Sequence, residues 1–93
     1  MRFPEWARND TRLRLRFLCS VMALHVSADG SVYQLARLAK VKYPTALKAI
    51  QSGRMTTSLA AKMLAVAEGS GVKAAWLVAP ELLQLNDDGE VIE

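Results

Sequence analysis

The stretch LARLAKVKYPTALKAIQSGRM, residues 35–55, contains two short apolar periodicities separated by Lys40-Val41-Lys42. Pro44 suits the first turn of a helix, where its missing N–H is not needed, and Gly53 suits the position after a helix end. These signals predict a helix that begins near Pro44 and ends before Gly53. With the periodicity before the break, they predict two short helices joined by a tight turn, which is typical of a helix-turn-helix.

A capping box marks the start of the first of these helices. Ser31 is followed three residues later by Gln34. The Ser31 hydroxyl can accept from the backbone N–H of Gln34, while the Gln34 side chain reaches back to the backbone N–H of Ser31. We therefore expect a helix from Val32 to about Ala39. Ala36 and Ala39 leave room for the second helix to cross close to it.

The outward face of the second predicted helix is small, polar and basic. A helical wheel places Leu47 and Ile50 toward the first helix. Short side chains on the opposite side would let the backbone approach base edges in a DNA major groove, while hydroxyls and amines would meet base acceptors. The residues predicted to read bases, on this side and in the first turn, are Tyr43, Pro44, Thr45, Lys48, Ala49 and Ser52.

Polar and basic side chains at the ends of the two helices are placed to meet DNA phosphates, which fix a protein's register on the duplex. The residues predicted to contact the DNA backbone are Gln34, Arg37, Lys40, Lys42 and Arg54. Each piece alone has an ordinary explanation, since an alanine-rich helix pair is commonly mere packing. The combination of a capped helix, a short turn, a proline-started helix and a basic surround favours DNA binding.

Charge is unevenly distributed along the chain. Residues 1–62 contain 11 of the 12 Lys and Arg residues and three acidic residues, a net charge of +8, whereas residues 63–93 have a net charge of −5. A basic front and an acidic tail suggest a polyanion-binding surface and a tail with another role, the alternative being a solvated surface with chance asymmetry. The arginines near the N-terminus either follow the flanking DNA backbone or are only solvated; they are Arg2, Arg8, Arg12, Arg14 and Arg16.

Size and composition favour one globular domain that is not an enzyme. The chain has 93 residues, 52% of them hydrophobic, which is enough for a core. With Cys19 and His25 as the sole cysteine and histidine, neither an internal disulfide nor a Cys/His metal site is expected, and no cofactor is predicted. No catalytic set stands out in the basic half. No signal-peptide core or membrane span is recognised, so a cytoplasmic protein is expected.

Three segments are predicted along the chain: an N-terminal arm over 1–10, a helical domain over 11–81, and an acidic tail or β-hairpin over 82–93. In the arm, Phe3 and Trp6 are expected to pack as anchors. The hairpin is suggested by an alternating stretch, an Asp-Gly turn and Glu-Val-Ile-Glu, with a frayed tail as the alternative.

Three further helices are predicted within the helical domain. Asn-Asp-Thr at 9–11 and Thr-Thr-Ser at 56–58 supply helix caps, and a short helix is expected over about 73–78. Cys19 lies in an apolar run of the first helix and is expected to be a buried thiol. The apolar stripe predicted for that helix is formed by Leu13, Phe17, Val21 and Leu24, with Leu18 and Met22 beside it.

Residues 34–54, QLARLAKVKYPTALKAIQSGR, resemble the helix-turn-helix of lambda repressor-like (Cro/C1-type, XRE) transcriptional regulators. Leu35-Ala36, Ala39 and Val41 match the pattern of their first helix and turn, and KAIQSGR at 48–54 is similar to the end of the recognition helix in phage Cro. AVAEGSGVKAAWLVAPE at 65–81 resembles the phage-repressor stretch in which Gly-Val leads into a short helix bearing Trp-Leu. The resemblance implies an all-α, five-helix DNA-binding domain that acts as a dimer on a palindromic operator.

The sequence departs from that family pattern at the turn. Lys40 stands where glycine is usual, Lys42 stands where a capping serine is usual, and the spacing to the end of the second helix is one residue longer than in most repressor-type relatives, as in Cro. Without a longer turn, Ala46 would fill the core position and Leu47 would face DNA. With it, Leu47 and Ile50 would fill the core. We favour the longer turn because a leucine exposed on a groove face is unfavourable.

The predicted function is sequence-specific binding of double-stranded DNA by a small transcriptional regulator, a repressor of phage or prophage type. The alternative is a protein-interaction module, such as an antitoxin, that binds a protein partner. The basic half is expected to face DNA and the acidic tail to lie away from it, since carboxylates near phosphates would oppose binding. We expect a homodimer to form on that distal side. The residues predicted at the dimer interface are Trp76, Leu77, Leu83, Leu85, Val91 and Ile92.

Overall fold

The computed structural model describes residues 1–92, and Glu93, the last residue of the predicted tail, lies outside them. Within the described residues, extended segments are limited to the isolated bridges Arg2–Glu90 and Leu85–Val91, so the predicted all-α class is confirmed. None of the described helices has the length and apolar character needed to cross a membrane. The elements are η1 (Glu5–Ala7), α1 (Thr11–Val26), α2 (Val32–Leu38), α3 (Tyr43–Ser52), α4 (Thr57–Val66), α5 (Ala74–Val78) and η2 (Pro80–Leu82).

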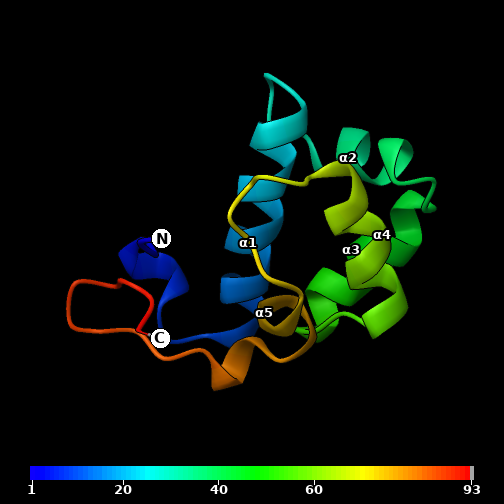
Figure 1. Cartoon of the computed structure of the whole chain (residues 1–93). Coiled ribbons are helices and arrows are strands. Elements are labelled where there is room, and N and C mark those ends of the chain that lie inside the picture. Colours follow the sequence, from blue (N-terminus) through cyan, green and yellow to red (C-terminus); the bar gives the residue numbers. More distant parts are fainter. Residues whose placement is uncertain (93) are drawn as a thin grey trace.

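Helix α1 is the central element, with α2, α3 and α4 on one side and the two terminal segments on the other (Figure 1). Asp10 begins it, as the capping signal predicts, because its carboxylate accepts hydrogen bonds from the N–H groups of Arg12 and Leu13. The position expected for the buried stripe of this helix is wrong. The side chains of α1 that are buried are Leu15, Leu18, Cys19, Met22 and Ala23.

The residues expected to form that stripe lie on the opposite face of α1. Leu24 is 62% exposed, and Leu13 is half-buried. Phe17 and Val21 are half-buried and pack against the core from this second face. The reason is that α1 carries apolar residues on two opposite faces, so periodicity alone does not identify the face that the other helices cover.

The ends of the other helices follow the predicted capping signals. The Ser31 hydroxyl accepts a backbone N–H in the first turn of α2, and the Thr56 hydroxyl does the same for α4. Gly53 ends α3 with a φ of 89°, and its N–H donates to the carbonyls of Ala49 and Ile50. This left-handed backbone favours glycine, which explains the helix end at this residue.

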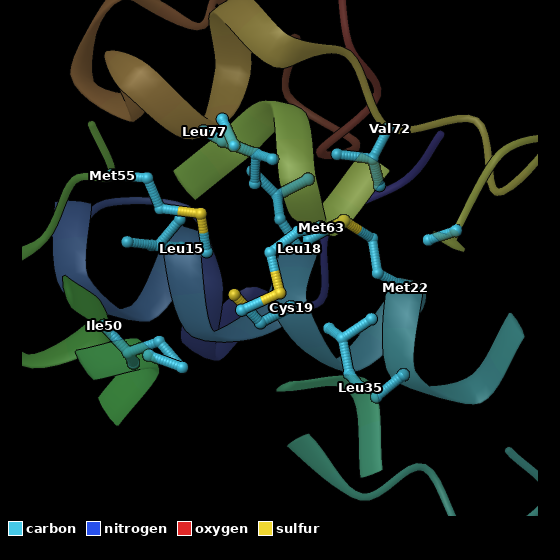
Figure 2. Packing of buried hydrophobic residues seen from close by; sticks show 14 of the residues in the cluster. Leu15, Leu18, Cys19, Met22, Leu35, Ile50, Met55, Met63, Val72 and Leu77 are labelled. Carbon is cyan, nitrogen blue, oxygen red and sulfur yellow. The ribbon is translucent and has the colours of Figure 1, made fainter. Parts of the chain in front are cut away.

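The core forms where α1 meets the other helices (Figure 2). Its fully buried large side chains include Leu15, Leu18 and Met22 of α1, Leu35 of α2, Met63 of α4 and Leu77 of α5. Cys19 is buried as predicted, and burial raises the pKa of its thiol to about 12. The thiol therefore stays protonated at neutral pH and packs as a small apolar group.

The expectation that Leu47 fills the core is wrong. The buried residues of α3 are Ala46 and Ile50, whereas Leu47 is half-buried and lies outside the core cluster. Ala36 of α2 and Ala39, which caps the C-terminal end of α2, are buried, and α3 contacts α2. The close approach that these small residues allow leaves room for the methyl group of Ala46 rather than for a leucine side chain.

The two ends of the chain pair with each other (Figure 1). The Phe3 N–H donates to the Gly89 carbonyl over 2.7 Å, and the Val91 N–H donates to the Met1 carbonyl over 3.1 Å. Leu85 and Val91 form an antiparallel bridge across the turn that links them. The predicted hairpin is therefore present as a turn with single bridges, and the N-terminal arm pairs along its other edge.

The two predicted anchors of the arm differ in burial. Phe3 is fully buried, and its ring centroid lies 4.7 Å from that of Phe17, which confirms it as an anchor. Trp6 is 51% exposed and meets Phe17 through a ring edge, with the centroids 6.2 Å apart. The arm therefore covers the second apolar face of α1.

Truncation of two apolar residues of α3, Leu47 and Ile50, tests the register of this helix. Ile50→Ala should lower the free energy of unfolding by about 2–5 kcal/mol, because Ile50 is 6% exposed and truncation leaves a cavity. Leu47→Ala should have a clearly smaller effect, since Leu47 lies outside the core cluster. Denaturant unfolding of both variants would measure the difference, and equal losses would contradict the register.

Candidate functional site

The connection between α2 and α3 is a tight turn over residues 39–42. The Val41 N–H donates to the Ala36 carbonyl over 2.9 Å, and the Lys40 N–H donates to the Arg37 carbonyl over 3.1 Å. This pair of bonds is a Schellman motif, which satisfies the last carbonyls of α2. Lys40 has a φ of 58°, so a lysine holds the left-handed backbone that favours glycine.

The centre of the outward face of α3 lies opposite Ala46 and Ile50. At helical spacing it falls at Pro44, Lys48 and Gln51, and all three are exposed. Pro44 and Lys48 were predicted base-reading residues. Gln51 was missed because the sequence-based wheel was centred one residue away, on Leu47 rather than Ala46, which turned Gln51 toward the side of the helix.

The remaining predicted base-reading residues of α3 lie beside this centre. Thr45 is exposed, whereas Ala49 is half-buried and packs against the core. The exposed Ser52 hydroxyl lies 2.8 Å from the Ala49 carbonyl oxygen and 3.1 Å from the Arg54 carbonyl oxygen. Donation to either carbonyl leaves this hydroxyl available to a ligand only as an acceptor.

Two tyrosines meet at the edge of this surface. The ring of Tyr43, which is 37% exposed, packs edge-on against the ring of Tyr33 with the centroids 5.5 Å apart. Tyr33 belongs to the first turn of α2 and is 53% exposed. Sequence reasoning missed Tyr33, since residues on two different helices share no periodic pattern that would bring them together.

The predicted DNA-backbone residues lie around α3. Lys40 and Lys42 are exposed immediately before it, and Arg54 is exposed just after it. Arg37 is exposed in the last turn of α2, while Gln34 is half-buried. The fold therefore brings basic side chains to both ends of α3.

The five arginines near the N-terminus divide into two groups. Arg14 donates to three backbone carbonyls in the arm and around η2, over 2.7–2.9 Å. Arg2 and Arg8 donate to backbone carbonyls of the hairpin turn. These three side chains hold the terminal segments together. Arg12 and Arg16 are exposed on α1.

An apolar groove of about 640 Å³ opens between α5, η2 and the C-terminal hairpin. Four of the predicted interface residues line it: Trp76, Leu83, Val91 and Ile92. Leu82 of η2 also lines it and is 76% exposed, although it was not among the predicted interface residues. The groove is thus a second surface, formed by other elements than those around α3.

Three of the predicted interface residues are less available to a partner, although one of them, Leu83, lines the groove. Leu77 is fully buried and Leu83 is 8% exposed, so both mainly belong to this chain's own core. Leu85 is half-buried and packs against that core. Sequence alone did not separate Leu82 from Leu83 because neighbouring leucines after a proline carry no periodicity.

No protein-family model matches the chain, and neither a curated protein nor a solved structure is found to be similar to it.

Two arginines only two residues apart on α1, Arg14 and Arg16, should differ in their effect on stability. Arg14→Ala should lower the free energy of unfolding by at least about 1.5–3 kcal/mol, because a charged donor to three backbone carbonyls is lost. Arg16→Ala should change it by less than about 0.5 kcal/mol, since Arg16 is exposed. Thermal or denaturant unfolding would compare them, and similar losses would contradict the structural role of Arg14.

Proposed function

We propose that this protein binds double-stranded DNA sequence-specifically, as a small transcriptional regulator of the repressor type. In this proposal α2, the turn and α3 form a helix-turn-helix, and α3 enters the major groove. The observation that carries the proposal is the exposed polar and basic face of α3, with lysines before it and an arginine after it. Lys48 would read base edges, and phosphates would fix the register.

The dimensions of α3 suit this role. Ten residues of α-helix extend about 15 Å. The DNA major groove is about 12 Å wide, so charges at the two ends of such a helix are spaced to meet the backbones on its two sides. Lys40 and Lys42 stand at one end of α3, and Arg54 stands at the other.

The left-handed lysine of the turn also supports the proposal. A non-glycine residue in this conformation is disfavoured by roughly 1–2 kcal/mol. Strained backbone of this kind is often found at functional positions. A phosphate contact through the Lys40 ammonium would account for a lysine where glycine fits better.

The arrangement of charge is a third support. The acidic hairpin, with Asp87, Asp88 and Glu90, pairs with the N-terminal arm on the side of α1 away from α3 (Figure 1). Carboxylates there lie apart from the phosphates that α3 would approach. The basic side chains around α3 and the acidic hairpin are therefore separated by α1, whereas Arg2 and Arg8 of the basic front donate to carbonyls of the hairpin turn.

A protein partner on the same face is the second candidate function. The exposed Tyr33–Tyr43 pair and Leu38, which is 49% exposed, are apolar groups suited to a protein interface. The salt dependence of binding affinity distinguishes the two functions. Binding through phosphate contacts weakens steeply as the salt concentration rises, whereas binding through an apolar protein interface does not.

Selection of bound duplexes from a random pool tests the DNA proposal. We expect enrichment of a palindromic consensus, and no enrichment would favour the protein-partner function. On the selected site, Lys48→Ala should lose about 1–3 kcal/mol of binding free energy, the usual worth of a base-edge contact. Its melting temperature should stay close to wild type because Lys48 is exposed. A variant that is folded and binds normally would contradict the assigned face.

We propose further that the protein acts as a homodimer through the apolar groove beside α5. One recognition helix reads few base pairs, and a symmetric dimer would place two of them about one helical turn of DNA apart. The backbone at Val91 is already paired within the chain, with Met1 on one side and Leu85 on the other. Contact would therefore come from side chains, above all Leu82 and Ile92, rather than from strand pairing.

A charge placed in the groove tests the dimer. Leu82→Asp should shift the protein toward monomer and weaken operator binding, because a carboxylate would be desolvated at the interface. Leu24→Asp is the matched control, since Leu24 is 62% exposed and does not line the groove. Sedimentation at tens of micromolar would decide. A wild-type monomer, or a Leu82→Asp dimer as stable as the control, would refute this interface.

A further inference from the structure

A small groove of about 220 Å³ lies between α1 and the C-terminal half of α3, apart from the predicted base-reading residues. Leu13 and Ile50 are its apolar residues, and Arg12, Arg16 and Gln51 are its polar ones. The two arginine guanidinium groups carry positive charge and offer only N–H donors. The Gln51 side-chain amide is neutral and offers N–H donors and one acceptor oxygen. Such a set is suited to an anion.

The two arginines are held beside α3 by the packing of the helices. A Cβ atom added to Gly53 would lie 3.3 Å from Cγ of Arg12, so the Arg12 stem runs along the end of α3. Arg16 follows four residues later and therefore lies on the same face of α1. Both side chains are exposed, so their charged ends are accessible to solvent and to a ligand.

Asp10, the acidic residue nearest in sequence to Arg12 and Arg16, caps the N-terminal end of α1. One carboxylate oxygen of Asp10 accepts from the N–H groups of Arg12 and Leu13, at 2.9 and 3.1 Å. Arg2, Arg8 and Arg14 differ from the groove arginines because each donates to backbone carbonyls of the arm, the η2 region or the hairpin turn. Of the five arginines, Arg12 and Arg16 are therefore the two whose charged ends are most accessible to an external ligand.

We infer that this groove binds a phosphate of the DNA backbone, with Arg12 and Arg16 as the charged contacts and Gln51 as a neutral donor. The inference rests on the proposed DNA-binding function and extends it from α3 to α1. Lys40 and Lys42 precede α3, whereas the groove lies by its last turns. Arg12 and Arg16 would thus anchor the DNA strand on the opposite side of the major groove from the two lysines.

The salt dependence of binding to a duplex of arbitrary sequence tests this site. Arg16→Gln should lower the slope of log affinity against log salt by about 0.9, which corresponds to about tenfold weaker binding at 0.1 M salt. Arg12→Gln should act in the same way. Arg12→Lys keeps the charge and should retain the slope, which separates a phosphate contact from loss of packing against Gly53.

Lys62→Gln is the control, because this substitution also removes one positive charge. Lys62 is exposed on α4 and lines none of the grooves described above. Retention of its slope, together with reduced slopes for both glutamine variants at unchanged melting temperature, supports the phosphate site. Steep salt dependence in wild type with unchanged slopes in both variants overturns this inference and leaves the DNA proposal standing. Wild-type protein that shows no salt-dependent DNA binding overturns both.

Discussion

The constraint on which the fold depends is that α1 is apolar on more than one face. Leu15, Leu18 and Met22 are covered by the other helices, and Phe17 on the opposite side needs a separate cover. Phe3 supplies it, and the arm that carries Phe3 is held by the hairpin. The terminal segments are therefore part of the folded domain, and Arg14 ties them to α1 through three backbone carbonyls.

Elements governed by local chemistry could be predicted from the sequence. Asp10, Ser31 and Thr56 cap helices where the sequence indicated, and Gly53 ends α3 in left-handed backbone. A cap depends on a side chain and a backbone amide only a few residues away, so the local sequence is enough to predict it. The burial of Cys19 follows similarly, because an apolar run surrounds it.

What could not be predicted depends on distances set by other elements. Whether Ala46 or Leu47 meets α2 is decided by how closely the two helices approach, and a shift of one residue turns Gln51 toward the candidate site. The five arginines look alike in the sequence, yet Arg14 meets carbonyls more than sixty positions away. Likewise, the pairing of the arm with the hairpin joins Met1 to Val91 and Phe3 to Gly89, and the sequence offers no signal for this register.

That pairing also has a consequence for biosynthesis. Phe3 leaves the ribosome well before its partner Gly89, which lies far later in the chain. The Phe3 carbonyl and Arg8 crowd so closely around Gly89 that a Cβ there would lie within 2.5 Å of both. During translation, the face of α1 that carries Phe17 therefore stays partly exposed until the hairpin has emerged and can hold the arm in place. Contacts of such long sequence separation form late, so the nascent domain passes through a stage with exposed aromatic surface.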